Sequence, residues 1–138
     1  MSTFRIFDIA GSAVAAQTVR LNTVASNLAN ANSVSSTREG TYKPRVPIFE
    51  AVTGKINGRD TGVAVRVTKI EEIGSTPNSR YEPSNPLADA NGFVYTPDIS
   101  AVEQVTDMVS ASRAYQNNIE VMRTARDLMM ATLRLGQM

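Results

Sequence analysis

The sequence has 138 residues, 42% of them hydrophobic, and a formal net charge of +1. This length allows one domain with a modest core and excludes two independent enzymatic domains. Basic and acidic residues are interspersed along the chain, so there is no basic stripe of the kind that binds nucleic acid. The absence of Cys and His excludes a disulfide, a thiolate nucleophile, an imidazole base and a typical zinc site. We therefore expect no cofactor and no metal.

The N-terminal segment, residues 1–37, is predicted to hold one helix of about 26 residues followed by a linker. Its apolar residues recur in steps of three and four. The series is Phe7, Ala10, Val14, Gln17, Leu21, Val24, Leu28 and Ala31. Polar and charged residues such as Arg5, Asp8 and Arg20 interrupt any apolar run, so neither a signal-peptide core nor a membrane span is expected. Gly11 and Ser12 are the weak point of this helix.

This N-terminal segment is poor in charge. Between Ile6 and Thr37 the only ionised side chains are Asp8 and Arg20. Helix surfaces that face water usually carry more charge, so we expect neighbouring subunits to bury the uncharged face. The alternative is a polar, disordered arm, which is compatible with this expectation if the arm orders on assembly.

The middle segment, residues 38–97, is predicted to be a small β-rich module, because it contains all six prolines and six of the eight glycines. The main strand is expected at Val63–Val67, with an extension over Ile70–Ile73 past a bulge. Shorter strands are expected at Val46–Phe49 and Phe93–Tyr95. Asn57-Gly58 indicates a reverse turn, and the proline-rich residues 75–86 indicate an extended path.

The C-terminal segment, residues 98–138, is predicted to form one long helix, because Ile99 to Leu135 contains neither Gly nor Pro. Asp98 is the expected N-cap, and Gly136 marks the end. At about 55 Å the helix would exceed the roughly 37 Å diameter of a compact globule of this length. A kink at Asn117-Asn118 is the alternative. The predicted heptad seam is Val105, Met108, Ser112, Tyr115, Ile119, Met122, Arg126, Met129 and Leu133.

Catalytic patterns are lacking. Glu71 and Glu72 are adjacent on a predicted strand, so they point to opposite faces and cannot act as an acid/base pair on one substrate. The segment 88–93 (ADANGF) lacks the ligand series of a calcium loop and is interpreted as a turn. Two alternatives stay open at this point: an adaptor or chaperone that binds a partner's amphipathic helix, and a small hydrolase that uses Asp or Glu.

The predicted fold is mainly α with a small β-rich middle. Long N- and C-terminal helices are expected to pair as an antiparallel coiled coil, with a short β-hairpin or sheet module between them. Rigidity would then come from interlocked helices. We therefore expect a structural protein that polymerises and has no catalytic activity.

Both ends of the chain resemble one known family. Leu21 to Asn32 (LNTVASNLANAN) resembles the N-terminal signature of the bacterial flagellar axial proteins, the rod and hook family. Tyr115 to Gly136 is similar to the C-terminal signature of that family. The middle segments Tyr42–Arg45, Gly62–Ile70 and Tyr81–Val94 are similar to the proximal-rod type. A departure is Ser33–Gly40, where axial proteins often carry a Thr-Pro-Gly-Tyr type of turn.

The resemblance implies a subunit of the bacterial flagellum basal body. It implies export by the flagellar type III apparatus without cleavage, and helical assembly in the periplasm into the drive shaft that transmits torque from the membrane ring to the hook. The implied partners are copies of itself, other flagellar rod proteins and the membrane-ring protein at the rod base, with no nucleic acid and no direct membrane insertion. The expected seam and assembly residues are Leu21, Val24, Asn27, Leu28, Asn30, Ala31, Val105, Met108, Tyr115, Ile119, Met122, Met129 and Leu133.

Overall fold

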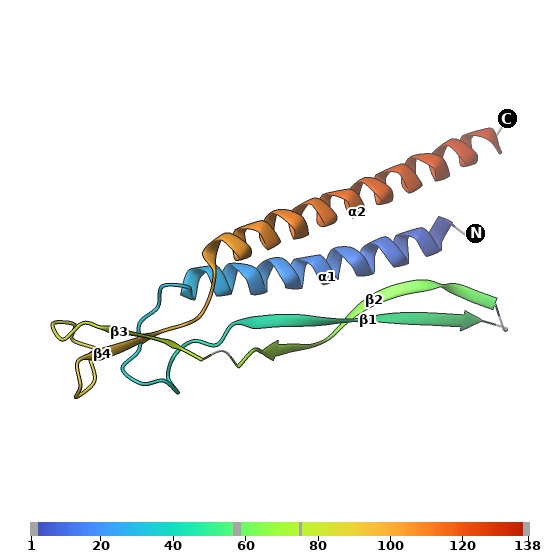
Figure 1. Ribbon diagram of the computed structural model, residues 1–138. Coiled ribbons are helices and arrows are strands. Elements are labelled where there is room, and N and C mark those ends of the chain that lie inside the picture. Colours follow the sequence, from blue (N-terminus) through green and yellow to red (C-terminus); the bar gives the residue numbers. More distant parts are fainter. Residues whose placement is uncertain (1–2, 57–58, 75, 137–138) are drawn as a thin grey trace.

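The computed structural model describes residues 3–56, 59–74 and 76–136. A helix stands at each end of the chain, with two small antiparallel sheets between them, as predicted. The elements in chain order are α1 (Thr3–Asn30), β1 (Arg45–Ile56), β2 (Arg59–Glu72), β3 (Asn78–Tyr81), β4 (Phe93–Thr96) and α2 (Ala101–Leu135). The molecule is elongated, with both termini at one end and the β3–β4 pair at the other (Figure 1).

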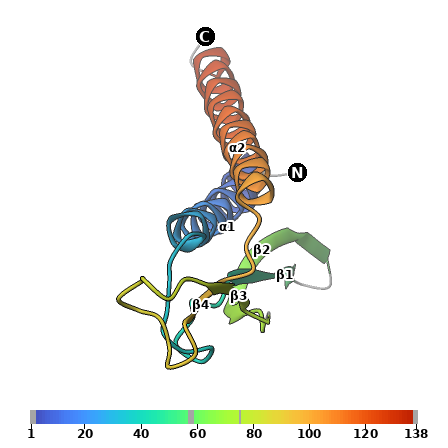
Figure 2. The same cartoon turned by 60° about the vertical axis from the view of Figure 1, so that its left-hand side comes forward.

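Helix α1 lies between α2 and the β1–β2 hairpin, and both views show this order (Figures 1 and 2). The two helices run in opposite directions, because Arg20 contacts Asp107 whereas Asn27, further along α1, contacts Gln104, earlier in α2. The buried apolar side chains of the two helices are small. Ala10, Ala16, Val24, Ala111 and Ala125 are all at most 3% exposed. Such small residues allow two helix backbones to approach closely.

Helix α2 is continuous through Asn117 and Asn118, so the alternative of a kink is wrong. Its 35 residues span about 52 Å at the standard rise. The predicted N-cap is also wrong by two residues, because the hydroxyl of Ser100, not the carboxylate of Asp98, accepts the backbone N–H of Glu103 at 3.3 Å. A side chain caps a helix only when the backbone places it beside the free N–H groups of the first turn. The predicted end at Gly136 is confirmed.

Strand β1 contains the predicted Val46–Phe49, and β2 contains the predicted Val63–Val67 but ends at Glu72, one residue before the predicted end at Ile73. The predicted strand at Phe93–Tyr95 lies in β4. Ile48 pairs with Lys69 and Phe49 pairs with Val67, so Thr68 is an extra residue on β2. This confirms the predicted bulge between Val67 and Ile70. The predicted turn at Asn57-Gly58 lies outside the described residues. The short strand β3 was not predicted, because its sequence, NSRY, lacks an apolar alternation.

Helix α1 is slightly longer at its start than predicted, and Gly11 does not interrupt it. The linker after α1 is anchored to β4, because Ser35 and Tyr95 exchange two backbone hydrogen bonds of 2.8 and 2.9 Å. Among the described residues, no helix has the length and apolar character needed to cross a membrane.

Candidate assembly site

The residues predicted to form the seam near the end of the N-terminal helix are all at least half-buried, and Asn27 among them bonds to Gln104 of α2. Val24, Asn27 and Ala31 are buried, and Leu21, Leu28 and Asn30 are half-buried. On α2 the half-buried members of the prediction are Met108, Tyr115, Ile119, Met122 and Met129. Val105 and Leu133, by contrast, are 47% and 61% exposed.

Two buried positions on α2 lie one residue before positions of the predicted seam. Ala111 is 0% exposed and Ala125 is 3% exposed, whereas the predicted seam contained Ser112 and Arg126. The reason is that alanine at these positions lets α1 approach closely, while the Arg126 guanidinium keeps its hydration. Arg126 was the signal in the sequence that could have revealed this shift, since it is the one charged residue in the predicted series. Whether Val105 and Leu133 take part in assembly stays a prediction.

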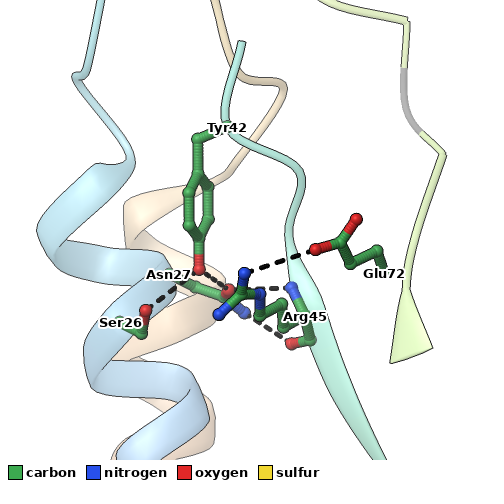
Figure 3. A network of polar contacts seen from close by, with 5 residues as sticks. All are labelled: Ser26, Asn27, Tyr42, Arg45 and Glu72. Carbon is green, nitrogen blue, oxygen red and sulfur yellow. Dashed lines mark hydrogen bonds and ion pairs between the residues drawn. The ribbon is translucent and has the colours of Figure 1, made fainter. Parts of the chain in front are cut away.

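Asn27 is the centre of a buried polar network that joins four segments of the chain (Figure 3). Its side chain is 2% exposed. The amide nitrogen donates to the backbone carbonyl of Arg45 at 2.8 Å and to Gln104 Oε1 at 3.2 Å. The amide oxygen accepts the backbone N–H of Arg45 at 2.9 Å and the hydroxyl of Tyr42 at 3.0 Å. All four hydrogen-bonding positions of this amide are thus used, which avoids the cost of burying an unsatisfied polar group.

The outer part of this network holds the beginning of β1 against α1. The Tyr42 hydroxyl lies 3.1 Å from the Ser26 hydroxyl, and the Arg45 guanidinium pairs with Glu72 at 3.3 Å (Figure 3). Sequence reasoning reached Asn27, Tyr42 and Arg45 only through the family resemblance. It missed Gln104, because a glutamine in a helix carries no signal of its partner.

A second polar contact joins the two helices. The Arg20 guanidinium pairs with the Asp107 carboxylate, and their side chains are 28% and 35% exposed. Arg20 is the only basic residue of α1 beyond its first turn. Its pairing leaves Asp8 as the one remaining ionised side chain of residues 6–32, so the outward surface of α1 is almost uncharged.

The hairpin crosses α1 with a twist, so that first one strand and then the other faces the helix. At Arg45 the edge of β1 bonds to Asn27. Further along, the backbone N–H of Val65 on β2 donates to the Ser12 hydroxyl at 3.0 Å, and that hydroxyl donates to the carbonyl of Ile9 at 2.7 Å. Figure 1 shows the two strands exchanging places beside α1. The right-handed twist of a two-stranded ribbon accounts for this exchange.

Glu71 and Glu72 have separate partners, Lys69 at 3.1 Å and Arg45 at 3.3 Å, as expected for neighbours on opposite faces of a strand. The segment 88–93 forms the predicted turn, in which the Asp89 carboxylate accepts the backbone N–H groups of Asn91 and Phe93 at 2.8 and 2.9 Å. In the described part of the chain, no group of three or more Asp or Glu residues is placed to hold a metal ion. These contacts stabilise the fold and provide no paired acid and base.

Large apolar side chains are exposed on α2 and on the hairpin. On α2 they include Val102 at 77%, Leu128 at 60% and Leu135 at 74% exposure. On the hairpin, Val63 and Ile70 are 49% and 52% exposed. Exposed apolar surfaces of this kind are typical of protein–protein contacts.

Two family models match this chain. The model of the flagella basal body rod protein matches residues 7–35, which lie mostly in α1. The model of the flagellar basal body rod FlgEFG protein C-terminal matches residues 90–135, which contain β4 and α2.

Curated relatives match over nearly the whole length. The flagellar basal-body rod protein FlgC of Salmonella typhimurium is 46% identical over 137 residues, which cover 99% of this chain and 100% of the relative. The FlgC protein of Yersinia enterocolitica is 43% identical with the same coverage. The FlgC protein of Aquifex aeolicus is 38% identical over 93% of this chain and 92% of its own length. With this identity over its full length, the chain belongs to the FlgC family of flagellar basal-body rod proteins.

Proposed function

We propose that this chain polymerises helically, together with other rod proteins, into the proximal part of the periplasmic drive shaft that transmits torque from the membrane ring to the hook. Membership of the family makes the chain a structural rod subunit and not an enzyme. The hydrolase alternative is thereby excluded. Export by the type III apparatus without cleavage, and contact with a membrane-ring protein at the rod base, belong to the same proposal.

The area of exposed surface supports assembly. The chain exposes 9509 Å². A compact monomer of the same mass would expose roughly 7,000 Å². Because large apolar side chains such as Val102, Leu128 and Leu135 are among the exposed ones, burying them between subunits would be favourable.

The observation that carries the polymerisation proposal is a continuous stripe on the outer side of α1. Its members recur in steps of three and four and are small or uncharged. They are Gly11, Ala15, Thr18, Asn22, Ala25 and Ala29. All except Gly11 are exposed, and a Cβ added at Gly11 would meet no atom within 4 Å. A glycine inside a helix costs about 1 kcal/mol relative to alanine, and packing within the chain does not account for it here. Close approach of a helix from a neighbouring subunit would account for both features.

We further propose that α1 and α2 pair as an antiparallel coiled coil that gives the subunit its stiffness. The contacts of Arg20 with Asp107 and of Asn27 with Gln104 fit this direction. The buried positions Ala111 and Ala125 are two heptads apart, as expected for a seam. A stiff subunit is what transmission of torque requires.

Substitution of Leu28 by aspartate tests the seam and the assembly together. Leu28→Asp would place an unpaired charge in a half-buried position of the proposed seam, and burying such a charge costs several kcal/mol. We expect a strain carrying this variant to lack rods and to be non-motile. Ser36→Asp, which adds the same charge at an exposed position of the linker after α1, is the matched control and should swim normally. Normal motility with Leu28→Asp would disprove the seam assignment.

A further inference from the structure

The loop between β3 and β4, residues 82–92, contains a chemically reactive pair, Asn91-Gly92. An asparagine that precedes glycine loses ammonia readily, because glycine has no side chain to hinder attack by its backbone nitrogen on the asparagine amide. Asn91 is exposed to water. The fold requires glycine at the second position, since its φ is +82° and a Cβ there would lie 2.8 Å from Tyr81 Cε2. The reactive pair is therefore built into the surface of this loop.

Deamidation of such a pair takes two steps and needs water as the only co-reactant. The Gly92 nitrogen loses its proton and bonds to Asn91 Cγ, the bond between Cγ and Nδ2 breaks, and ammonia leaves with that proton. Water then opens the succinimide ring at one of its two carbonyl groups. The product is aspartate or isoaspartate, and no atom is oxidised or reduced.

Backbone hydrogen bonds of Gly92 oppose this reaction. Its N–H donates to the Asp89 carbonyl at 2.9 Å, and its carbonyl accepts the N–H of Glu82 at 2.9 Å. The proton that has to leave is thus already held in a hydrogen bond, which deprotonation would break. The second bond ties the same residue to the end of β3, so the glycine is fixed on both sides.

Asp89 closes the turn around the reactive pair. Its carboxylate accepts the N–H groups of Asn91 and Phe93 at 2.8 and 2.9 Å and the hydroxyl of Tyr95 at 3.0 Å. Its own N–H donates to the Phe93 carbonyl at 2.8 Å. The negative carboxylate also disfavours the negative charge that a deprotonated Gly92 nitrogen would carry. Reaction is therefore expected only from a locally opened loop.

We infer that Asn91-Gly92 is a latent deamidation site, which the contacts of Asp89 keep unreactive while the loop is folded. Opening of the loop would let the reaction proceed, and the change would be permanent. Isoaspartate places an additional carbon atom in the main chain, so the bonds of Gly92 to Asp89 and Glu82 would no longer fit. This inference does not depend on the proposed function.

Mass spectrometry of the purified full-length chain tests the inference. The chain is incubated in mildly alkaline buffer, either folded or in denaturant, and the peptide that contains Asn91 is followed for conversion of its amide to a carboxyl group. Peptide mapping separates this site from the other Asn-Gly pair, Asn57-Gly58. We expect deamidation at Asn91 to be at least about tenfold slower in the folded chain than in denaturant, because only the opened loop reacts.

Asp89→Ala should raise the rate at Asn91 in the folded chain several-fold, toward the rate in denaturant. Asp127→Ala, which removes an exposed carboxylate on α2, is the matched control and should leave the rate unchanged. Tyr95→Phe removes one bond to Asp89 and should raise the rate less than Asp89→Ala does. Circular dichroism shows whether each variant is folded. If Asp89→Ala does not fold, the comparison of Tyr95→Phe with the control decides.

Each result supports or overturns one part of the inference. Slow reaction in the folded chain, together with faster reaction in a folded Asp89→Ala or Tyr95→Phe chain, supports it. Absence of deamidation at Asn91 in denaturant overturns the site itself. Equal rates in the folded and denatured chains overturn its protection by the fold. Folded variants that react no faster than Asp127→Ala overturn the role of Asp89.

Discussion

The side-chain amide of Asn27 pairs with the main chain of Arg45 through two hydrogen bonds, of 2.8 and 2.9 Å, as a neighbouring β-strand would. A single helical residue thus completes the edge of β1 at the place where the hairpin meets α1. The same amide also bonds to Tyr42 and Gln104, so it links both helices to the β-rich middle.

Asn27→Ala should therefore destabilise the chain. The substitution leaves the part-buried N–H and C=O of Arg45 without their partner, and a fully buried polar group left unsatisfied costs about 1–3 kcal/mol. Denaturant unfolding of the purified protein would measure this loss. Asn22→Ala, an exposed position on the same helix, is the control and should change the free energy of unfolding by less than about 0.5 kcal/mol. Equal effects of the two variants would contradict the role of Asn27.

Gly11→Ala should separate the stability of the chain from its assembly. Because an added Cβ meets no atom within 4 Å, alanine should stabilise the isolated chain by about 0.5–1 kcal/mol. The same methyl group should hinder the neighbouring helix and reduce motility. Thermal unfolding and swimming assays provide the two measurements. Gly74→Ala, which also has no atom within 4 Å, is the control outside the helices. A Gly11→Ala strain that swims as well as the Gly74→Ala strain would argue against close packing on the stripe.

Ala111→Leu should disrupt the contact between α1 and α2. Ala111 is 0% exposed, so the larger side chain has to push the helices apart, at a cost of about 1–3 kcal/mol. Ala131→Leu, at an exposed position of the same helix, should have almost no effect. Circular dichroism during thermal unfolding would show the difference. If Ala111→Leu unfolded at the temperature of the unmodified chain, the assigned contact face of α2 would be wrong.

Acidification should loosen the β3–β4 loop through Asp89. The backbone N–H of Phe93, together with Asn91 and Tyr95, holds the pKa of the Asp89 carboxyl below its ordinary value of 3.8. Since the pKa in the folded chain is the lower one, the stabilisation is fully present above pH 3.8 and is lost as the pH falls through the folded value. NMR chemical shifts of Phe93 and Asn91, followed from about pH 6 to about pH 2, would detect this change. In Asp89→Asn the same amides should show no such titration.

Several features of the fold follow from local sequence patterns. The absence of Gly and Pro from Ile99 to Leu135 predicted a long helix, and α2 occupies Ala101–Leu135. Alternation of valines at Val63–Val67 predicted the main strand, and the break in that alternation predicted the bulge now found at Thr68. These predictions succeed because helix continuity and strand alternation depend on residues close together in the chain.

Other features depend on contacts between distant segments, so the local sequence predicts them only weakly. The steps of three and four on α2 fit more than one face, and only the approach of α1 selected Ala111 and Ala125 over Ser112 and Arg126. Ser100, and not Asp98, is the N-cap of α2, because the path of the backbone between β4 and α2 decides which side chain reaches the first turn of the helix. No local pattern predicted that Gln104 would bond to Asn27.

The division of the chain into two helices and a β-rich middle, and the low charge of the N-terminal helix, can be read from the residues alone. The buried face of α2, the side chains that join the segments and the surfaces left open for other subunits depend on how the elements pack. Backbone propensity acts only over a few neighbouring residues. Burial and polar pairing, by contrast, are selected by the geometry of contacts such as Asn27 with Arg45, between residues on different elements.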